Sequence, residues 1–340
     1  MSCWWCGSAL AAEDRFCRQC GESRRSDGPW EHGADPGLWP AEGENRVLTV
    51  LFPDLCGYMA ASRQAPGDEA VALVNTVQGT YIAAVHEHGG FIARCQHDEV
   101  LALFGVPTAS VDAPVQAIRA ALSIRTAIRA LGLDVKIGIN TGLVYFGPVG
   151  SVLHSELAVV GPPADVAARL VGKGAQVALP GQILVGASTY QQAQHEFDFG
   201  EGRVLELKGI RYPVTSYEVL DRRAAPSVEP AEPNADARWS RIASGLDGLA
   251  RSARQLLQVA SVIGAPFEAA LLGRVVPDRA RLPEALEHLV AAGWLGREGE
   301  RFRIGDAAVA EVLYQSLLPA RRAELHAAIA AARGERGHDD

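Results

Sequence analysis

The stretch Arg46-Val47-Leu48-Thr49-Val50-Leu51-Phe52-Pro53-Asp54-Leu55-Cys56-Gly57-Tyr58 decides the predicted fold. Its aliphatic and β-branched first half predicts a buried β-strand over Arg46–Phe52. Asp54 follows where that strand ends. A carboxylate at a strand end can serve as an oxygen ligand for a hard cation such as magnesium. The stretch therefore predicts a strand that carries a candidate metal ligand.

A second acidic residue, Asp98, lies near the turn of a predicted hairpin whose strands are Phe91–Cys95 and Val100–Phe104. Two carboxylates at strand ends are what a protein needs to hold metal ions against the phosphates of a nucleotide. Each also has an ordinary structural explanation, because Asp54 suits a helix N-cap and Asp98 suits a turn.

The segments around and after the hairpin alternate between helix and strand. Apolar residues at helical spacing predict helices over Asp68–Glu87, Ala113–Leu131 and Ala164–Val171. Apolar, β-branched tracts predict strands over Val135–Asn140 and Leu143–Phe146. Such alternation is typical of an α/β fold, in which helices cover a sheet.

Three later tracts complete a pattern that resembles a known family. They are Lys136–Gly142 (KIGINTG), Val159–Leu170 (VVGPPADVAARL) and Leu205–Ile210 (LELKGI). Over residues 45–221 the order resembles a class III nucleotidyl cyclase catalytic domain. The resemblance implies a ferredoxin-like βαββαβ core and conversion of ATP to 3′,5′-cyclic AMP and pyrophosphate at a homodimer interface. It also implies two Mg²⁺ or Mn²⁺ ions in each active site.

The resemblance gives roles to individual residues at the end of the first strand. It implies that Asp54 and Asp98 bind the metal ions. It also implies that Leu55, Gly57 and Tyr58 belong to a loop that opens a helix and cradles the β- and γ-phosphates. Glycine at position 57 lets the backbone approach phosphate closely.

The helix predicted over Ala164–Val171 resembles the family's helix that carries an Asn and, four residues later, an Arg. Arg169 occupies the Arg position, and its fixed charge suits the negative charge that develops at phosphorus. Asp165 occupies the Asn position, and the i, i+4 spacing places both residues on one helical face, toward the partner's nucleotide. A carboxylate cannot donate a hydrogen bond and adds negative charge beside a polyanion. An ordinary helix charge is therefore the alternative explanation of Asp165.

The positions that select the base also depart from the family pattern. Arg94 stands where the family often has Lys for adenine or Glu for guanine, and as a cation it favours ATP over GTP. Ala158 stands where an acceptor for the adenine amino group is expected and cannot make that bond. His97 replaces the Gly before Asp98, which costs on the order of 1 kcal/mol if the turn needs positive φ. Lys208 resembles a lysine that reaches the triphosphate, although a surface lysine at a strand end explains it equally well.

Two Cys-x-x-Cys pairs lie near the start of the chain, at Cys3, Cys6, Cys17 and Cys20. The spacing is typical of a zinc ribbon, in which Zn²⁺ replaces a core that so short a segment cannot build. Disulfides or a redox motif are alternatives, and zinc is favoured because no thioredoxin-like pattern surrounds the pairs. We expect the ribbon over residues 1–22 and a Gly- and Pro-rich linker over 23–44. We expect Cys56 and Cys95 to be small buried hydrophobes.

The last part of the chain has a different composition, rich in Ala, Leu and Arg, and follows a Pro/Ala/Glu linker over 222–238. A short hairpin is predicted between Trp294–Gly296 and Arg301–Ile304. The helices predicted around it are Ala250–Val262, Pro266–Val275, Leu282–Ala292, Ala307–Leu317 and Ala320–Ala332. Helices with a two-stranded wing predict a winged-helix domain over 239–335. The region is similar to the segment after the ATPase core in AAA/STAND signalling ATPases, but without a phosphate loop we do not expect ATP hydrolysis.

The charge pattern argues against nucleic acid as a partner. The formal net charge is −8, and residues 239–340 contain equal numbers of arginine and acidic residues and no lysine. Because phosphate neutralisation supplies most non-specific affinity for DNA, we expect the winged-helix domain to bind a protein partner instead. No segment resembles a signal peptide or reaches the roughly 18 apolar residues of a membrane helix. We expect a cytoplasmic protein that does not enter a membrane.

Three functions fit the sequence. The first is a homodimeric adenylate cyclase of full or reduced activity, supported by Asp54, Asp98 and Arg169. The second is a cyclase-derived domain without catalysis that serves as a nucleotide-binding or dimerising regulatory scaffold. The third is an adaptor that binds a partner through its zinc ribbon and winged helix. We favour the first, because a chain that had abandoned nucleotide chemistry would have no physical need to keep two like charges near each other.

Overall fold

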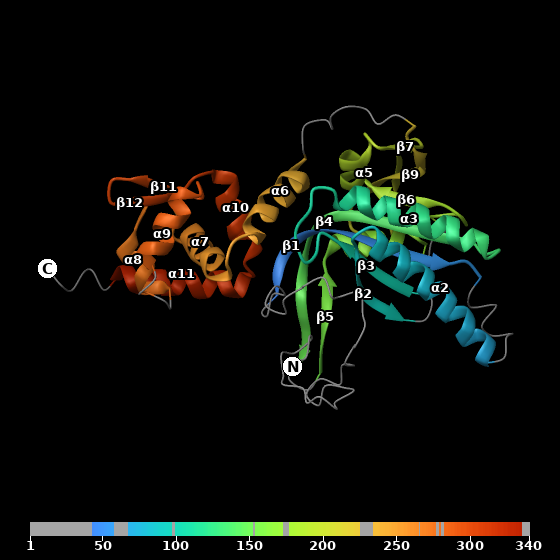
Figure 1. Cartoon of the computed structure of the whole chain (residues 1–340), viewed down its shortest axis with the longest axis horizontal. Helices are drawn as coiled ribbons and strands as arrows, with labels where there is room; N and C mark the ends of the chain where they lie inside the picture. The colour runs from blue at the N-terminus through green and yellow to red at the C-terminus, as the bar shows by residue number, and fades with distance from the viewer. Residues whose placement is uncertain are drawn as a thin grey trace.

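The computed structural model describes residues 43–57, 67–96, 99–151, 154–172, 177–224, 234–264, 266–276, 279 and 282–334. Several predicted site residues lie outside the described residues: Cys3, Cys6, Cys17, Cys20, Tyr58, His97 and Asp98. Figure 1 shows a sheet with helices, built by the first part of the chain, and a separate group of helices with a small sheet, built by the last part.

The first part begins with six elements in βαββαβ order. They are β1 (Glu44–Leu55), α2 (Gly67–Glu87), β2 (Phe91–Gln96), β3 (Glu99–Phe104), α3 (Ala113–Ala130) and β4 (Val135–Ser151). The strands are ordered β2-β3-β1-β4, and each neighbouring pair is antiparallel. This is the ferredoxin-like core that was predicted, and its helices agree with the sequence prediction to within one residue.

Further elements extend the core into a larger sheet. They are β5 (His154–Val160), α4 (Pro162–Leu170), β6 (Ile183–Gly186), α5 (Ala187–Ala193), β7 (Phe197–Phe199), β8 (Arg203–Leu205) and β9 (Val214–Arg222). Of these, only α4 was predicted. β5 pairs with the end of β4, and the resulting hairpin extends away from the other strands in Figure 1.

The two faces of the sheet are covered by different helices, because side chains alternate along each strand. Leu51 and Leu55 of β1 pack in one cluster with buried residues of α2 and α3. Leu48 and Val50, on the opposite face, pack in a second cluster with Ala167 of α4. Burying both faces explains why β1 is a nearly continuous run of apolar residues.

The prediction of two strands, Val135–Asn140 and Leu143–Phe146, is wrong, because β4 is a single strand. The intervening Thr141 and Gly142 continue the strand, since β1 pairs with β4 without interruption from Leu55↔Val135 to Glu44↔Phe146. The Thr141 hydroxyl also lies 2.9 Å from that of Thr49 on β1. Partners supplied by another strand therefore keep a Thr-Gly pair extended, although it resembles a turn.

The last part of the chain is a helical group with a three-stranded sheet. Its helices are α6 (Ala235–Asp247), α7 (Arg251–Ile263), α8 (Ala269–Val275), α9 (Leu282–Ala291), α10 (Ala307–Ser316) and α11 (Pro319–Gly334). Its strands are β10 (Phe267–Glu268), β11 (Leu295–Glu298) and β12 (Arg301–Ile304), in the order β10-β12-β11. The predicted hairpin is β11–β12. The helix predicted over Pro266–Val275 is instead β10 followed by α8, because Phe267 pairs with Phe302.

Both predicted linkers are too long. Glu44, assigned to the first linker, is the first residue of β1. The second linker, 222–238, overlaps the end of β9 at Arg222 and the start of α6, where the Asn234 side chain accepts a hydrogen bond from the Ala237 amide. The polar N-cap starts a helix inside a segment whose composition resembles a linker. None of the helices in the described ranges is long and apolar enough to span a bilayer.

Candidate functional site

Asp54 lies near the end of β1, directly opposite Lys136 on β4. The Lys136 Nζ lies 3.0 Å from an Asp54 carboxylate oxygen, and both side chains are 21% exposed. Along the strand, Asp54 points to the opposite face from Leu51 and Leu55, which pack against α2 and α3. Its carboxylate therefore faces the side of the sheet that α4 covers. The pair therefore places an anion and a cation together at one edge of that face.

One described side chain at this edge, that of Asp54, is of a type that binds divalent cations. The Asp54 carboxylate offers the hard oxygen atoms that Mg²⁺ and Mn²⁺ prefer. Because β3 is antiparallel to β1, its first residue, Glu99, lies at the same end of the sheet as Asp54. Asp98 directly precedes Glu99 in the sequence. Among the described residues, no three His, Cys, Asp or Glu side chains gather as a metal site, so further oxygens from Asp98 or from phosphate would be needed.

α4 packs very closely on β4, and glycine makes this possible. A Cβ atom on Gly138 would lie 2.2 Å from the carbonyl oxygen of Ala167, and one on Gly142 would lie 2.8 Å from a Pro163 ring carbon. Asn140, between the two glycines, donates a hydrogen bond of 3.3 Å to the Pro163 carbonyl. The KIGINTG tract therefore fixes the position of α4 on the sheet.

Asp165 and Arg169 lie on the side of α4 that faces away from the sheet. Val166, Ala167 and Leu170 are buried, whereas Asp165 is exposed and Arg169 is half-buried. Neither charged side chain has an ion pair or hydrogen bond within the described part of the chain. The predicted i, i+4 pair is thus confirmed as a shared helical face, and that face is open to a partner or a ligand.

The two predicted base-selecting residues face opposite sides. Arg94 is exposed on β2 and pairs with Leu101, which packs on the side of the sheet that carries α4. Ala158 pairs with Gly147 of β4 and alternates with Leu157 and Val159, which pack against that same cluster. The Ala158 side chain therefore points to the other side of the hairpin.

The remaining predicted nucleotide contacts lie around this face. Lys208 is exposed in a turn, and the preceding Leu207 is buried in a cluster with Val166 and Leu170 of α4. Lys208 therefore lies beside α4. At the end of β1, Leu55 is buried, and Gly57 has φ of +78°, a conformation that favours glycine.

The two described cysteines differ from the prediction that both are buried. Cys56 is half-buried, and its amide donates to the Asp134 carbonyl at 2.9 Å. Cys95 is exposed near the end of the edge strand β2. Partial burial raises the pKa of both thiols, and for Cys56 the nearby Lys136 ammonium offsets part of that rise.

Lys136 was not predicted to be a site residue, although it is the first residue of the KIGINTG tract. Its partnership with Asp54 depends on the register between β1 and β4, which no local pattern specifies. The signal available in the sequence was the lysine itself, a charged residue at the start of a strand whose other face is fully buried.

Residues 41–221, more than half of the chain, match the sequence family of the adenylate and guanylate cyclase catalytic domain. An uncharacterized protein of Mycobacterium tuberculosis is 29% identical over 177 residues, which is 51% of this chain and 31% of that protein. An uncharacterized protein of Mycobacterium bovis has the same identity and coverage. The chain thus spans only about a third of these curated relatives.

Two solved structures share the fold of this region. The adenylyl cyclase CyaB from P. aeruginosa superposes with a TM-score of 0.50 at 24% identity, covering 54% of this chain and 98% of that one. The guanylyl cyclase Cya2 superposes with a TM-score of 0.50 at 28% identity, covering 56% of this chain and 99% of that one. Both matches cover almost the entire cyclase chain.

Proposed function

Because the chain belongs to the adenylate and guanylate cyclase catalytic domain family, we propose that residues 45–221 convert ATP to 3′,5′-cyclic AMP and pyrophosphate. The observation that carries this proposal is the Asp54–Lys136 pair on the same face of the sheet as Arg169 of α4. A carboxylate for metal ions and cations for phosphate oxygens are the groups that phosphoryl chemistry requires.

In the proposed reaction, each residue has the role that its side-chain chemistry allows. Asp54 and Asp98 would hold two divalent cations, which when bound promote deprotonation of the ribose 3′-hydroxyl and neutralise the triphosphate. Arg169 carries a guanidinium with no partner among the described residues, so it is available to stabilise charge that develops at the α-phosphorus. Lys136 and Lys208 provide ammonium groups for the polyphosphate. The Gly57 loop supplies backbone N–H groups.

We propose that the protein acts as a homodimer, and the direction of α4 supports this. Asp165 and Arg169 face away from their own sheet, so we propose that they meet the nucleotide held by a second copy of the chain. ATP is the proposed substrate, with GTP second, because exposed Arg94 offers only hydrogen-bond donors and would suit a ring nitrogen acceptor of adenine. Ala158 offers no acceptor that would favour either base.

A second candidate is a regulatory scaffold without turnover, and Asp165 favours it. The exposed carboxylate of Asp165 stands where a hydrogen-bond donor would support catalysis, and it repels a polyanion. Such a domain would still dimerise and bind nucleotide.

The test is cyclic nucleotide production by the purified protein with Mn²⁺ and ATP, with GTP in parallel. Asp54→Ala should abolish the product, whereas Asp221→Ala, at an exposed position on β9, should leave it unchanged. Product from ATP that Asp54→Ala removes would support the cyclase. No product from either nucleotide, with a folded and dimeric protein, would favour the scaffold.

We further propose that the last part of the chain is a winged-helix module that does not bind DNA. The order α7, β10, α8, α9, β11, β12 suits such a module, with α9 in the place of a recognition helix. The exposed face of α9 carries Glu284 and Glu287 but no Lys or Arg. The arginines of the β11–β12 wing are each paired with a carboxylate: Arg297 with Glu287, Arg301 with Glu268 and Arg303 with Glu298. Paired charges give little attraction for phosphate.

For the N-terminal cysteines we propose a zinc ribbon in a reducing, cytoplasmic setting. The expected result is one Zn²⁺ per chain, released by a thiol-reactive mercurial and measured with a chromogenic chelator. Cys3→Ser should lower that content, whereas Cys95→Ser should not. Zinc-free protein with two disulfides would contradict the proposal.

A further inference from the structure

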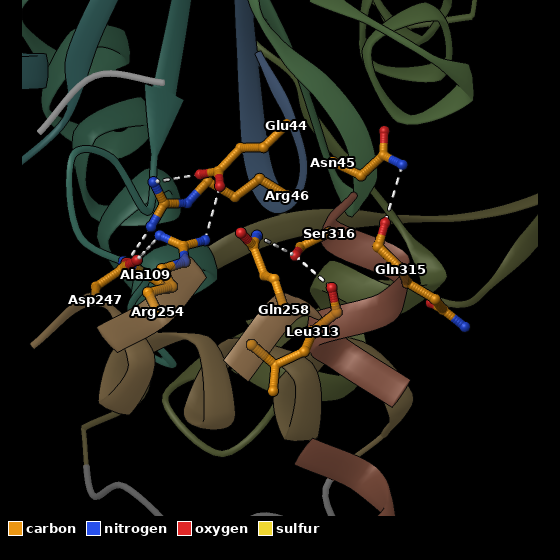
Figure 2. Close-up of polar contacts among 10 residues, drawn as sticks. All are labelled: Glu44, Asn45, Arg46, Ala109, Asp247, Arg254, Gln258, Leu313, Gln315 and Ser316. Carbon is orange, nitrogen blue, oxygen red and sulfur yellow. Dashed lines mark hydrogen bonds and ion pairs between the residues drawn. The ribbon is translucent and has the colours of Figure 1, made fainter. Parts of the chain in front are cut away.

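The start of β1 is held by the last part of the chain. Three consecutive residues of the strand each contact it, as Figure 2 shows. Asn45 donates to the Gln315 carbonyl at 3.0 Å, Glu44 pairs with Arg254 at 2.7 Å, and Arg46 pairs with Asp247. Successive residues of a strand point to opposite faces, so the C-terminal helices hold β1 from both sides.

The four charged residues, Glu44, Arg46, Asp247 and Arg254, form a closed ring of alternating charge, which we call the charge ring. Arg254 also pairs with Asp247 at 2.9 Å, and Arg46 lies 3.3 Å from Glu44. The amide of Ala109 donates to Asp247 at 2.8 Å. The side chains are largely buried, with Arg46 only 3% exposed. Because burial costs each charge its hydration, such a ring contributes little net stability, but removing one of its charges leaves an uncompensated buried charge and is strongly destabilising.

An apolar contact continues from the charge ring. Val47 of β1 and Ala109 belong to the same buried cluster as Trp239, Leu257 and other core residues of the C-terminal helices. The two parts of the chain therefore share one buried core at this contact, as the two sides of a stable domain interface do. The helical part already has a binding partner, which is the sheet of its own chain.

The start of β1, which the C-terminal helices hold, is connected to the candidate site through β4 and β5. The first residues of β1 pair with β4 over Leu143–Phe146, and β5 pairs with the same stretch of β4 through Val159 and Val160. We call Leu143–Phe146 with Ala158–Val160 the hairpin root. Gly161 follows β5 directly and starts α4, which carries Arg169. A shift of the β1 start would therefore move the hairpin root and, through Gly161, the helix that presents Arg169.

We propose that residues 234–334 are a docking domain whose partner is the start of β1 (Glu44–Val47) in the same chain, and that the charge ring sets their register. Its role is to hold the β4–β5 hairpin and α4 in one position. The inference goes beyond the proposed reaction and rests on it only in treating Arg169 as part of the site.

Hydrogen exchange of the full-length protein without nucleotide tests this proposal. Arg254→Met leaves a net negative charge buried in the charge ring, and exchange at the hairpin root should become about 100-fold faster, as expected when one partner of a buried ion pair is removed. β6, on the far side of β4, should keep its rate. Arg297→Met is the matched control, because it removes an arginine of the same region from an exposed pair, 2.7 Å from Glu287, and should change nothing at the root.

A double variant separates docking from unfolding. Arg254→Met with Glu44→Gln removes one charge of each sign and leaves the Arg46–Asp247 pair, so the exchange rate at the hairpin root should return to within about tenfold of the wild type. The proposal is wrong if Arg254→Met speeds exchange only within residues 234–334, or matches Arg297→Met at the root. It is also wrong if the double variant exchanges as fast as Arg254→Met. Since no nucleotide is present, these outcomes are independent of whether the protein is a cyclase.

Discussion

The Lys136 ammonium group lies 3.0 Å from the Asp54 carboxylate, on the neighbouring strand. The negative charge of Asp54 is therefore already balanced by the ammonium group of Lys136 when no metal ion is bound. A cation entering the site must displace the ammonium group or share the carboxylate with it. Lys136 is thus a competitor of the metal ion as well as a candidate phosphate ligand.

Lys136→Gln should tighten the binding of Mn²⁺ measured without nucleotide. A partly exposed ion pair contributes up to about 1 kcal/mol, so the gain should be up to about fivefold in the dissociation constant. Titration calorimetry or the electron paramagnetic resonance signal of free Mn²⁺ measures it. Arg129→Gln, which removes an exposed arginine 3.8 Å from Asp134, should have no effect. Weaker binding in Lys136→Gln would contradict the competition.

Asp165→Asn should raise the rate of cyclic nucleotide formation. The amide replaces a carboxylate that repels phosphate and can donate a hydrogen bond in the transition state, and a single such donor contributes roughly 10²-fold or more in other enzymes. The measurement is product formed per minute at saturating Mn²⁺ and ATP. Asp221→Asn is the control for loss of an exposed charge. If turnover remains zero in Asp165→Asn, the scaffold becomes the better account.

Gly138→Ala should destabilise the sheet region by about 1–3 kcal/mol, the usual cost of overpacking. The added methyl would lie 2.2 Å from the Ala167 carbonyl oxygen, so α4 would have to move away from β4. Gly79→Ala is the matched control, because no atom lies within 4 Å of a Cβ at that position of α2, and a helical alanine gains up to about 1 kcal/mol. Urea denaturation measures both. If Gly138→Ala and Gly79→Ala changed the free energy of unfolding equally, the close contact of α4 with β4 would not be rigid.

His88 should make stability depend on pH between neutral and mildly acidic conditions. Burial lowers the pKa of its imidazole below the usual value of 6.5, and Nε2 lies 3.0 Å from the Ser123 hydroxyl. The unfolded chain therefore takes up the proton first. The stability is fully present above pH 6.5 and is lost as the pH falls through the lowered pKa.

The free energy of unfolding of the wild type and of His88→Gln at several pH values tests this expectation. The advantage of the wild type should shrink as the pH falls below 6.5. His326→Gln, at an exposed position, controls for loss of an imidazole. An advantage that is constant across the range would contradict the assignment.

Much of the core could be predicted from the sequence, because its signals are local. Helical spacing predicted α2 and α3 to within one residue, and the i, i+4 relation of Asp165 and Arg169 predicted a shared face. These features depend on residues within one or two turns of a helix. The strands β6, β7 and β8 have only three or four residues each, and the pairing of these strands and of β9 is set by distant segments, so no local periodicity predicted them.

The contacts in the charge ring and at the candidate site join residues that are far apart in sequence. Arg46 and Asp247 are 201 residues apart, and nothing near either residue specifies the other. Glu44 was assigned to a linker because its Gly- and Pro-rich neighbours dominate the local composition, whereas its actual environment is supplied by Arg254. The register that joins Lys136 to Asp54 has the same origin.

The contact of Asn45 with Gln315 also has a consequence for the order in which the protein is made. The two residues are 270 positions apart, and at about 5–20 residues per second a ribosome needs roughly 14–54 s to cover that distance. During this time the nascent sheet can form, but the C-terminal helices that bury Val47, Glu44 and Arg46 have not yet been synthesised. Chains that terminate early would therefore leave an apolar residue and two charges uncovered at the start of a strand, where chaperones and proteases can recognise the incomplete product.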